Sequence, residues 1–195
     1  MRTAAGTVDH VRLPVTPIAA YLLVAGWSSV PFVPAEPMLV AVGSYAATGA
    51  LALPLVVVAA AAGSLVSDLA KYALGRVAGP RLLRRLGRRE SGARAIAWIE
   101  ARARRIGPLV IVPSYFVPFG VVASTLLCGA LRMRSGPVAA ASAAGAALWA
   151  ALFVLLGFAG GAVTHDPVHG VLLALPVALA LGLGLSRLVT ARTPG

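Results

Sequence analysis

Long apolar stretches leave this chain few possible folds. Residues 51–74 and 137–163 are each long enough to cross the hydrocarbon core of a bilayer as a helix. Inside a bilayer every backbone polar group must be satisfied internally, so only helices and closed barrels are available. The stretches lack the short alternating segments of a barrel. The sequence therefore predicts an all-α integral membrane protein.

Composition supports this class. Charged residues make up 12% of the chain, whereas a soluble domain has about a quarter. With 59% hydrophobic residues, the chain is expected to be neither a soluble globular enzyme nor a disordered protein. Cys128 is the single cysteine, which argues against a disulfide-rich secreted module. We interpret Cys128 as a packing residue, because no base lies near it in the sequence.

The net charge of +11 is concentrated in one segment, since ten of the 17 basic residues lie between positions 76 and 105. A basic cluster can bind nucleic acid, but between apolar stretches it is more typical of a cytoplasmic loop. We therefore expect no nucleic-acid partner. Apolar residues at helical spacing among the arginines predict an amphipathic helix at the membrane interface; they are Ile96, Ile99, Ala103 and Ile106, with Trp98 beside them.

Prolines break two further apolar regions. Residues 31–37 contain three prolines and Glu36, and residues 108–131 are interrupted by Pro113, Pro118 and Gly120. Arginines flank the second region on both sides, so we expect both of its ends on one side of the membrane. A re-entrant hairpin is therefore favoured over a span there. Two broken regions, each followed by a long span, are typical of inverted-repeat transporters.

The predicted organisation is a single membrane domain, residues 14–190, between an N-terminal segment, 1–13, and a C-terminal tail, 191–195. Its parts are a first broken region at 14–50, a span at 51–75, a basic loop at 76–107, a re-entrant hairpin at 108–131, and spans at 137–163 and 171–189. The positive-inside rule makes the basic loop and the C-terminus cytoplasmic. The N-terminus is inside if 14–30 spans the membrane, and outside if 14–48 forms a complete hairpin. We expect no removable signal peptide.

Two carboxylates fall within the apolar regions. Glu36 either faces a polar interior or sits hydrated at the outer interface, and the sequence leaves both open. Asp68 begins a polar helix face that continues through Lys71, Tyr72, Gly75 and Arg76. The spacing allows Asp68 to pair with Lys71. A polar stripe in an apolar span usually faces the interior of a bundle, although Lys71 and Arg76 fit equally well at a helix end that emerges into water.

Other polar groups carry weaker signals. Arg132 and Arg134 either bind a phosphate or headgroup, or only mark the topology. His165, Asp166 and His169 have loose metal-ligand spacing, but Pro167 breaks any helix that would align them. We predict no metal site, no cofactor and no catalytic residue, and hence no enzyme, because no nucleophile–base pair or phosphate loop is present.

Three blocks of the sequence resemble the DedA family of bacterial membrane proteins, also called the VTT or SNARE-associated family. The first block is 34–43, a Pro-x-acid segment leading to a glycine. The second is 63–79, with its Gly, Asp, Tyr, Gly-Arg and Gly in register. The third runs from Phe116-Val-Pro118 through Gly129 to Trp149. The resemblance implies a helical bundle with two opposed re-entrant hairpins, in which Pro34, Gly63, Gly75, Pro118 and Gly129 are structural.

The family is implicated in moving lipid carriers such as undecaprenyl phosphate across the bilayer, and in proton-linked transport. The resemblance therefore implies a flippase-like protein of the bacterial inner membrane, whose partners are membrane lipids, a lipid-carrier phosphate and protons. A homo-oligomer is compatible with it. The candidate substrate- and proton-binding residues are Glu36, Asp68, Tyr72, Arg76, Arg132 and Arg134.

The chain departs from the family at two places. The family's second hairpin usually has an arginine three residues before the proline and another three after it; Tyr115 and Val121 stand there. Residues 24–27 also lack an acid that many members have. Two alternatives therefore stay open: a proton-driven transporter of a small solute or ion, and a non-transporting membrane protein that affects envelope integrity.

Overall fold

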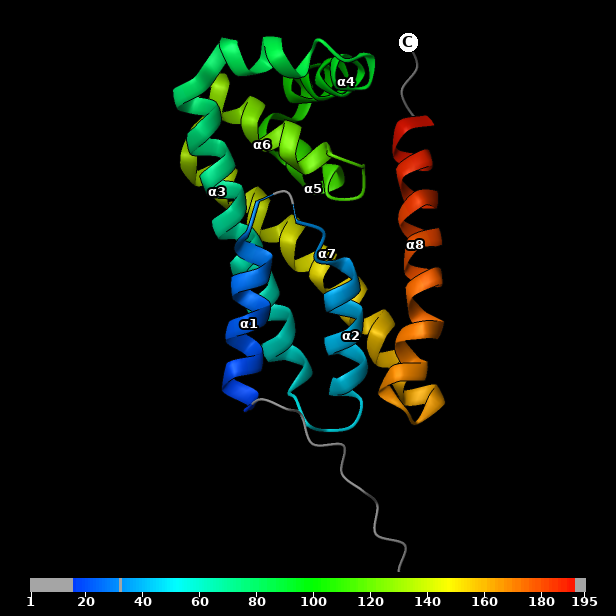
Figure 1. Ribbon diagram of the computed structural model, residues 1–195. Coiled ribbons are helices and arrows are strands. Elements are labelled where there is room, and N and C mark those ends of the chain that lie inside the picture. Colours follow the sequence, from blue (N-terminus) through cyan, green and yellow to red (C-terminus); the bar gives the residue numbers. More distant parts are fainter. Residues whose placement is uncertain (1–15, 32, 192–195) are drawn as a thin grey trace, which may run out of the picture.

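The computed structural model describes residues 16–31 and 33–191, and all regular secondary structure in this part of the chain is helical (Figure 1). Its elements are α1 (Pro17–Ser29), α2 (Glu36–Ala46), α3 (Leu53–Leu86), α4 (Glu90–Ile106), the 3-10 turn η1 (Gly107–Val110), α5 (Ile111–Ser114), α6 (Gly120–Ala130), α7 (Ser135–Thr164) and α8 (Pro167–Ala191). The all-α prediction is confirmed. The predicted N-terminal segment 1–13 lies outside the described residues, as does the predicted tail 191–195 apart from its first residue.

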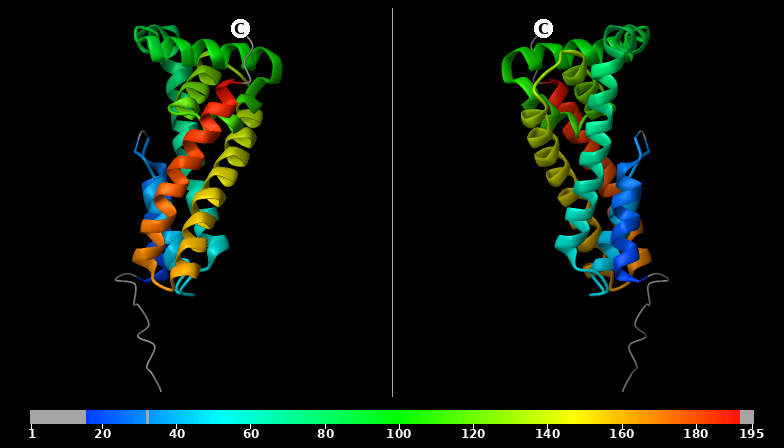
Figure 2. Two further views of the ribbon diagram at one scale, coloured as in Figure 1. Left: turned by 90° about the vertical axis from the view of Figure 1, so that its right-hand side faces the viewer. Right: turned by 90° about the vertical axis from the view of Figure 1, so that its left-hand side faces the viewer.

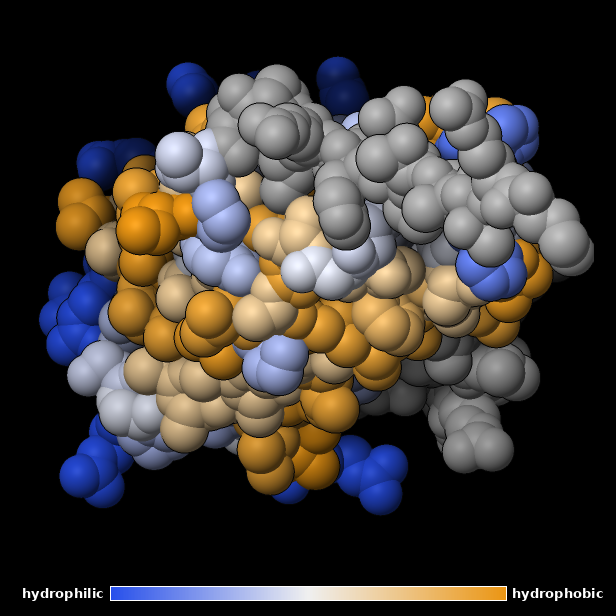
Figure 3. Space-filling view, turned by 90° about the horizontal axis from the view of Figure 1, so that it is seen from below, coloured by the Kyte–Doolittle hydropathy of each residue, from blue (hydrophilic) through white to orange (hydrophobic). Residues whose placement is uncertain are grey.

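Two helices are long and apolar enough to cross a bilayer, namely α3 over Leu53–Gly79 and α7 over Ser135–Thr164. They run in opposite directions through the molecule (Figure 1). Both leave large apolar side chains exposed, for example Val58 and Val66 on α3 and Leu155 on α7. Seen from one end, hydrophobic residues cover most of the surface that is drawn in colour (Figure 3). In water such a surface would drive association, whereas lipid solvates it.

Helix α3 continues past the predicted end of its span and bends at Gly79. This residue has φ 44° and ψ −133°, a conformation that an L side chain rarely adopts. Beyond the bend the chain lies across one end of the bundle together with α4 (Figures 1 and 2). On α4, Ala103 is buried and Ile106 is exposed; the side chains of Trp98, Ile99, Arg102 and Arg104 lie outside the described part.

The two proline-broken regions contain short helices joined by irregular linkers. Residues 30–35 connect α1 to α2, and residues 115–119 connect α5 to α6. Helix α1 packs on α3 while α2 packs on α7, and likewise α5 packs on α7 while α6 packs on α3. In each broken region, therefore, one helix packs on α3 and the other packs on α7. This arrangement brings the two linkers to the middle of the molecule (Figure 1).

Glycines allow the close crossing of α2 and α7. A Cβ atom on Gly43 would clash with the carbonyl group of Val154, and a Cβ atom on Gly157 would clash with the carbonyl group of Val40. Each helix thus places a glycine against the backbone of the other. Close backbone approach through small residues is a general device for packing helices in membranes.

The same device joins α3 and α6. A Cβ atom on Gly75 would clash with the carbonyl group of Leu126, and a Cβ atom on Gly129 would clash with that of Tyr72. Gly63, twelve residues before Gly75, lies against the backbone of α1. These glycines, which the family resemblance marked as structural, hold α3 between one helix of each broken region.

Candidate functional site

A cavity of about 610 Å³ lies between the two linkers and the long helices α3 and α7. Both broken regions contribute to its wall, α3 contributes polar side chains, and α7 contributes aromatic ones. The lining includes Ser28, Pro34, Glu36, Ser64, Ser67, Asp68, Lys71, Tyr115, Pro118, Val121, Trp149 and Phe153. The volume lies within the usual range of small-molecule sites.

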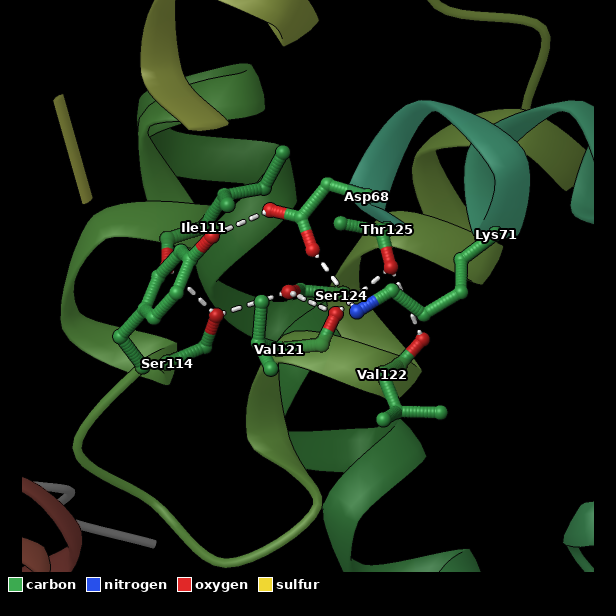
Figure 4. Close-up of polar contacts among 9 residues, drawn as sticks. Asp68, Lys71, Ile111, Ser114, Val121, Val122, Ser124 and Thr125 are labelled. Atoms are coloured by element: carbon green, nitrogen blue, oxygen red, sulfur yellow. Dashed lines mark hydrogen bonds and ion pairs between the residues drawn. The ribbon is translucent and has the colours of Figure 1, made fainter. Parts of the chain in front are cut away.

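Asp68 and Lys71 form a buried ion pair in this cavity (Figure 4). The distance from Lys71 Nζ to Asp68 Oδ1 is 2.8 Å, and the two side chains are 7% and 2% exposed. The residues are three positions apart on α3, which places them on one helix face. A buried pair costs desolvation energy that its own attraction offsets, so removing one partner strands a charge.

Tyr115 completes this cluster from the other broken region. Its hydroxyl donates a hydrogen bond of 2.6 Å to Asp68 Oδ2, so that both carboxylate oxygens of Asp68 have a partner. Tyr115 lies three residues before Pro118, at the position where the resembled family usually has an arginine. Tyr115 is absent from the site residues predicted from the sequence, and its place at the family's arginine position is the signal that identifies it.

Glu36 also lines the cavity and is partly buried. It is the first residue of α2, where the helix dipole favours a negative charge. Among the described residues it has no ion-pair partner within 4.0 Å. The charged groups of the described lining are therefore two carboxylates, Glu36 and Asp68, and one ammonium group, Lys71.

Aromatic rings form another part of the cavity wall. The ring of Trp149 lies 6.0 Å from that of Tyr115 and 5.6 Å from that of Phe153, centroid to centroid. Trp149 and Phe153 follow Gly145 by four and eight residues, just as Ser67 and Lys71 follow Gly63. Equivalent positions on the two long helices thus supply a polar wall and an aromatic wall to the same cavity.

Tyr72 and Arg76, which belong to the predicted polar face of α3, make contacts outside the cavity. The Tyr72 hydroxyl donates a 2.6 Å hydrogen bond to the carbonyl oxygen of Met133, and Arg76 Nη1 donates one of 2.8 Å to the Tyr72 hydroxyl. Tyr72 is buried and Arg76 is exposed, and neither lines the cavity. The residues of this polar face therefore have two surroundings: Tyr72 contacts the α6–α7 linker, while Asp68 and Lys71 face the cavity.

Arg132 and Arg134 are not brought to the cavity. Both are exposed in the linker between α6 and α7, where Arg132 has φ 53° and Arg134 precedes the first turn of α7. Among the predicted structural residues, Pro34 and Pro118 do line the cavity, one from each linker. Residues from all three sequence blocks that resemble the family therefore line one cavity.

The His165–His169 segment is a helix cap. Asp166 Oδ1 accepts hydrogen bonds from the backbone N–H groups of Val168, at 2.8 Å, and His169, at 3.0 Å. These bonds, that of His169 first, hold the pKa of the Asp166 carboxyl below its usual value. Within the described residues no group of three His, Cys, Asp or Glu side chains is placed to hold a metal ion.

Comparison with known proteins identifies the family. Residues 33–159, which include every cavity-lining position named above except Ser28, match the VTT domain. The chain is similar to the inner membrane protein YohD of Escherichia coli (strain K12), with 31% identity over 128 residues, 65% of either chain. It is also similar to the uncharacterized membrane protein YbfM of Bacillus subtilis (strain 168), with 27% identity over 137 residues, 70% of this chain and 84% of YbfM.

The match thus spans just under two thirds of the length of YohD. No solved structure matches the chain significantly. The domain match covers more than half of the sequence and agrees with the all-helical fold and its two membrane-length helices. The chain belongs to the VTT-domain (DedA) family of membrane proteins.

Proposed function

We propose that this protein is a transporter of the bacterial inner membrane that translocates a phosphorylated lipid carrier of the undecaprenyl phosphate type, coupled to protons. The observation that carries the proposal is the cavity, in which the linkers of both broken regions meet the buried Asp68–Lys71 pair. Ionisable groups inside a membrane protein are costly, and they usually mark a substrate or proton path. The name of the relative YohD supports the inner membrane as the location.

In this proposal the broken regions are re-entrant hairpins. Helix α1 begins and α2 ends at one end of the bundle, while α5 begins and α6 ends nearer the other (Figure 1). The basic segment around Arg81–Arg88 and α4 lie at the second end, which we assign to the cytoplasm by the positive-inside rule. The 165–169 loop and the start of α1 are then external, and the C-terminus is cytoplasmic.

A cavity that holds charged groups between opposed hairpins gives a lipid headgroup a path through the bilayer while its tail remains in the hydrocarbon. Glu36 and Asp68 are the proton acceptors in this scheme, since they are the carboxylates of the described lining. Proton uptake would lower the negative charge of the cavity as an anionic headgroup enters.

A second candidate function is proton-driven transport of a small solute, which the cavity volume of about 610 Å³ also accommodates. The two functions differ in their substrate and in how it enters the cavity. A lipid headgroup needs lateral access from the bilayer, whereas a soluble molecule does not. A non-transporting role would leave both carboxylates dispensable.

The test is translocation of undecaprenyl phosphate in proteoliposomes, followed by its accessibility on the two leaflets. We expect the wild-type protein to exceed empty liposomes, and Glu36→Gln and Asp68→Asn each to lower the rate. Glu90→Gln is the matched control, because Glu90 is an exposed carboxylate on α4, outside the cavity. No movement by folded, inserted wild-type protein would reject this substrate, and full activity of both cavity variants would reject the role of Glu36 and Asp68 as proton acceptors.

A further inference from the structure

Lys71 is the only lysine of the chain, since the other sixteen basic residues are arginines. It is also the only cation among the described residues that line the cavity. Arg76, Arg132 and Arg134 are exposed at the surface instead. The chain therefore places its single lysine in the cavity, beside a buried carboxylate. An ammonium group is a compact point charge with three donors, and it can turn from one oxygen to another.

The charge balance of the cavity opposes an anion unless protons enter first. Glu36 and Asp68 carry two negative charges against the single positive charge of Lys71, so the described lining is net negative when all three are ionised. In addition, Lys71 is already engaged by Asp68 at 2.8 Å. A phosphate that enters this cavity finds its only cationic partner occupied.

We infer that Lys71 is the anion-binding group of the cavity and that Asp68 holds it until a proton is taken up. The inference rests on the proposed function and names the residue that receives the phosphate. A hydronium ion gives a proton to a carboxylate oxygen of Asp68 and becomes water. The ammonium group of Lys71, which keeps its charge, then leaves Asp68 and donates a hydrogen bond to a phosphate oxygen. No other covalent bond forms or breaks.

The surroundings of the pair permit this exchange. Glu36 on α2 is the other charged group that faces the cavity, while α7 contributes Trp149 and Phe153, and α1 contributes Ser28. Tyr115 donates to Asp68 Oδ2 at 2.6 Å, and its hydroxyl oxygen can accept from the same carboxyl group once that is protonated. Asp68 thus keeps a partner in either state. Loss of the net negative charge follows directly from proton uptake by Asp68, by Glu36 or by both.

The single lysine makes a direct test possible. Protein labelled with ¹⁵N-lysine and placed in lipid nanodiscs gives one side-chain ammonium signal, that of Lys71. We expect this signal to shift when farnesyl phosphate is added and not when farnesol is added, and to shift further at pH 5.5 than at pH 8.0. No shift with farnesyl phosphate at either pH overturns the inference, and this measurement needs no variant.

Variants then test the exchange by equilibrium binding of radiolabelled farnesyl phosphate, with empty nanodiscs subtracted. Removal of a charge-assisted hydrogen bond should weaken binding about tenfold to hundredfold in Lys71→Met. The double variant Asp68→Asn/Lys71→Met, which strands no charge, should show the same loss and keeps the test valid if Lys71→Met unfolds. Asp68→Asn alone should bind at pH 8.0 nearly as tightly as at pH 5.5, and any small remaining pH dependence reports Glu36 or the phosphate itself, which titrates near pH 6.

A rescue distinguishes a cation that binds the ligand from one that only stabilises the fold. Because the Tyr115 side chain reaches Asp68 from the opposite linker, Tyr115→Arg in the Lys71→Met background should place a cation in the cavity again and restore binding. Wild-type affinity in the folded double variant Asp68→Asn/Lys71→Met overturns the inference even if the protein translocates lipid. Conversely, binding through Lys71 without translocation of undecaprenyl phosphate would reject the proposed function and leave this inference in place.

Discussion

Tyr115 and Asp68 are 47 residues apart in the sequence and are joined by a 2.6 Å hydrogen bond inside the molecule. The bond links the second broken region to the long helix α3, and it satisfies the carboxylate oxygen that Lys71 does not reach. The contact therefore connects the packing of the linker with the ionic state of the cavity. A substitution of either residue is expected to change the hydrogen bonding of the other.

The first prediction concerns this hydroxyl. Tyr115→Phe keeps the ring against Trp149 but leaves Asp68 Oδ2 without its donor. An unsatisfied buried acceptor costs about 1–3 kcal/mol, so we expect a lower midpoint in thermal unfolding of the detergent-solubilised protein. Tyr45→Phe is the control, since no hydrogen bond of its hydroxyl is found among the described residues. Equal midpoints for the two variants would contradict the assigned bond.

The second prediction concerns the ion pair. Lys71→Met leaves the Asp68 charge buried, and breaking such a pair typically costs about 3–5 kcal/mol. Asp68→Asn/Lys71→Met removes both charges and should recover a large part of that loss. A double-mutant cycle measured by denaturant unfolding checks this. Additive effects of the two single substitutions would show that the groups do not interact.

The third prediction concerns the crossing of α3 and α6. Gly75→Ala forces a methyl group against the carbonyl group of Leu126, so the helices must separate. Overpacking of this kind costs about 1–3 kcal/mol or more. Gly26→Ala on α1 is the matched control, because nothing lies within 4 Å of its added Cβ. Alanine favours a helix over glycine, so the control should be neutral or slightly stabilising in the same thermal assay.

The fourth prediction concerns pH and the cap of α8. Because the folded state lowers the pKa of Asp166, the cap stabilises the protein above the unfolded pKa of this carboxyl, and the contribution is lost as pH falls through the folded pKa. Asp166→Asn retains a capping oxygen without the charge. Thermal midpoints measured across the acidic range should show a pH-dependent difference between this variant and the wild type. A difference that is constant with pH would argue against the cap.

A fifth prediction concerns the aromatic wall. Trp149 is buried, packs against two tilted rings and lines the cavity. Trp149→Phe preserves an apolar ring and should bind the probe farnesyl phosphate nearly as the wild type does. Trp149→Glu adds a third negative charge to the cavity and should abolish binding at pH 8.0. Unchanged affinity in a folded Trp149→Glu protein would place the ligand elsewhere.

Much of this arrangement follows from the sequence because it depends on local patterns. Apolar length predicts the two membrane-length helices, prolines predict where the shorter helices break, and the i, i+3 spacing predicts that Asp68 and Lys71 can pair. These signals require only the geometry of one helix or the chemistry of one peptide bond. The family resemblance rests on the same local blocks, and it is confirmed by the domain match.

The composition of the site, in contrast, depends on which helix faces lie against one another. Tyr72 and Lys71 are neighbours on α3, yet one reaches the α6–α7 linker and the other faces the cavity. The position of Arg132 and Arg134 after the second broken region makes them candidates for binding a phosphate, but the fold leaves them exposed.

The sequence by itself determined an all-helical membrane protein, its broken regions and its unusual single lysine. Only the tertiary structure decided that Tyr115, Glu36 and the Asp68–Lys71 pair share one cavity. The physical reason is that helix crossings are set by close backbone contacts, such as those of Gly75 with Leu126 and Gly43 with Val154. Such contacts join positions far apart in the chain, and no periodicity within a single segment encodes them.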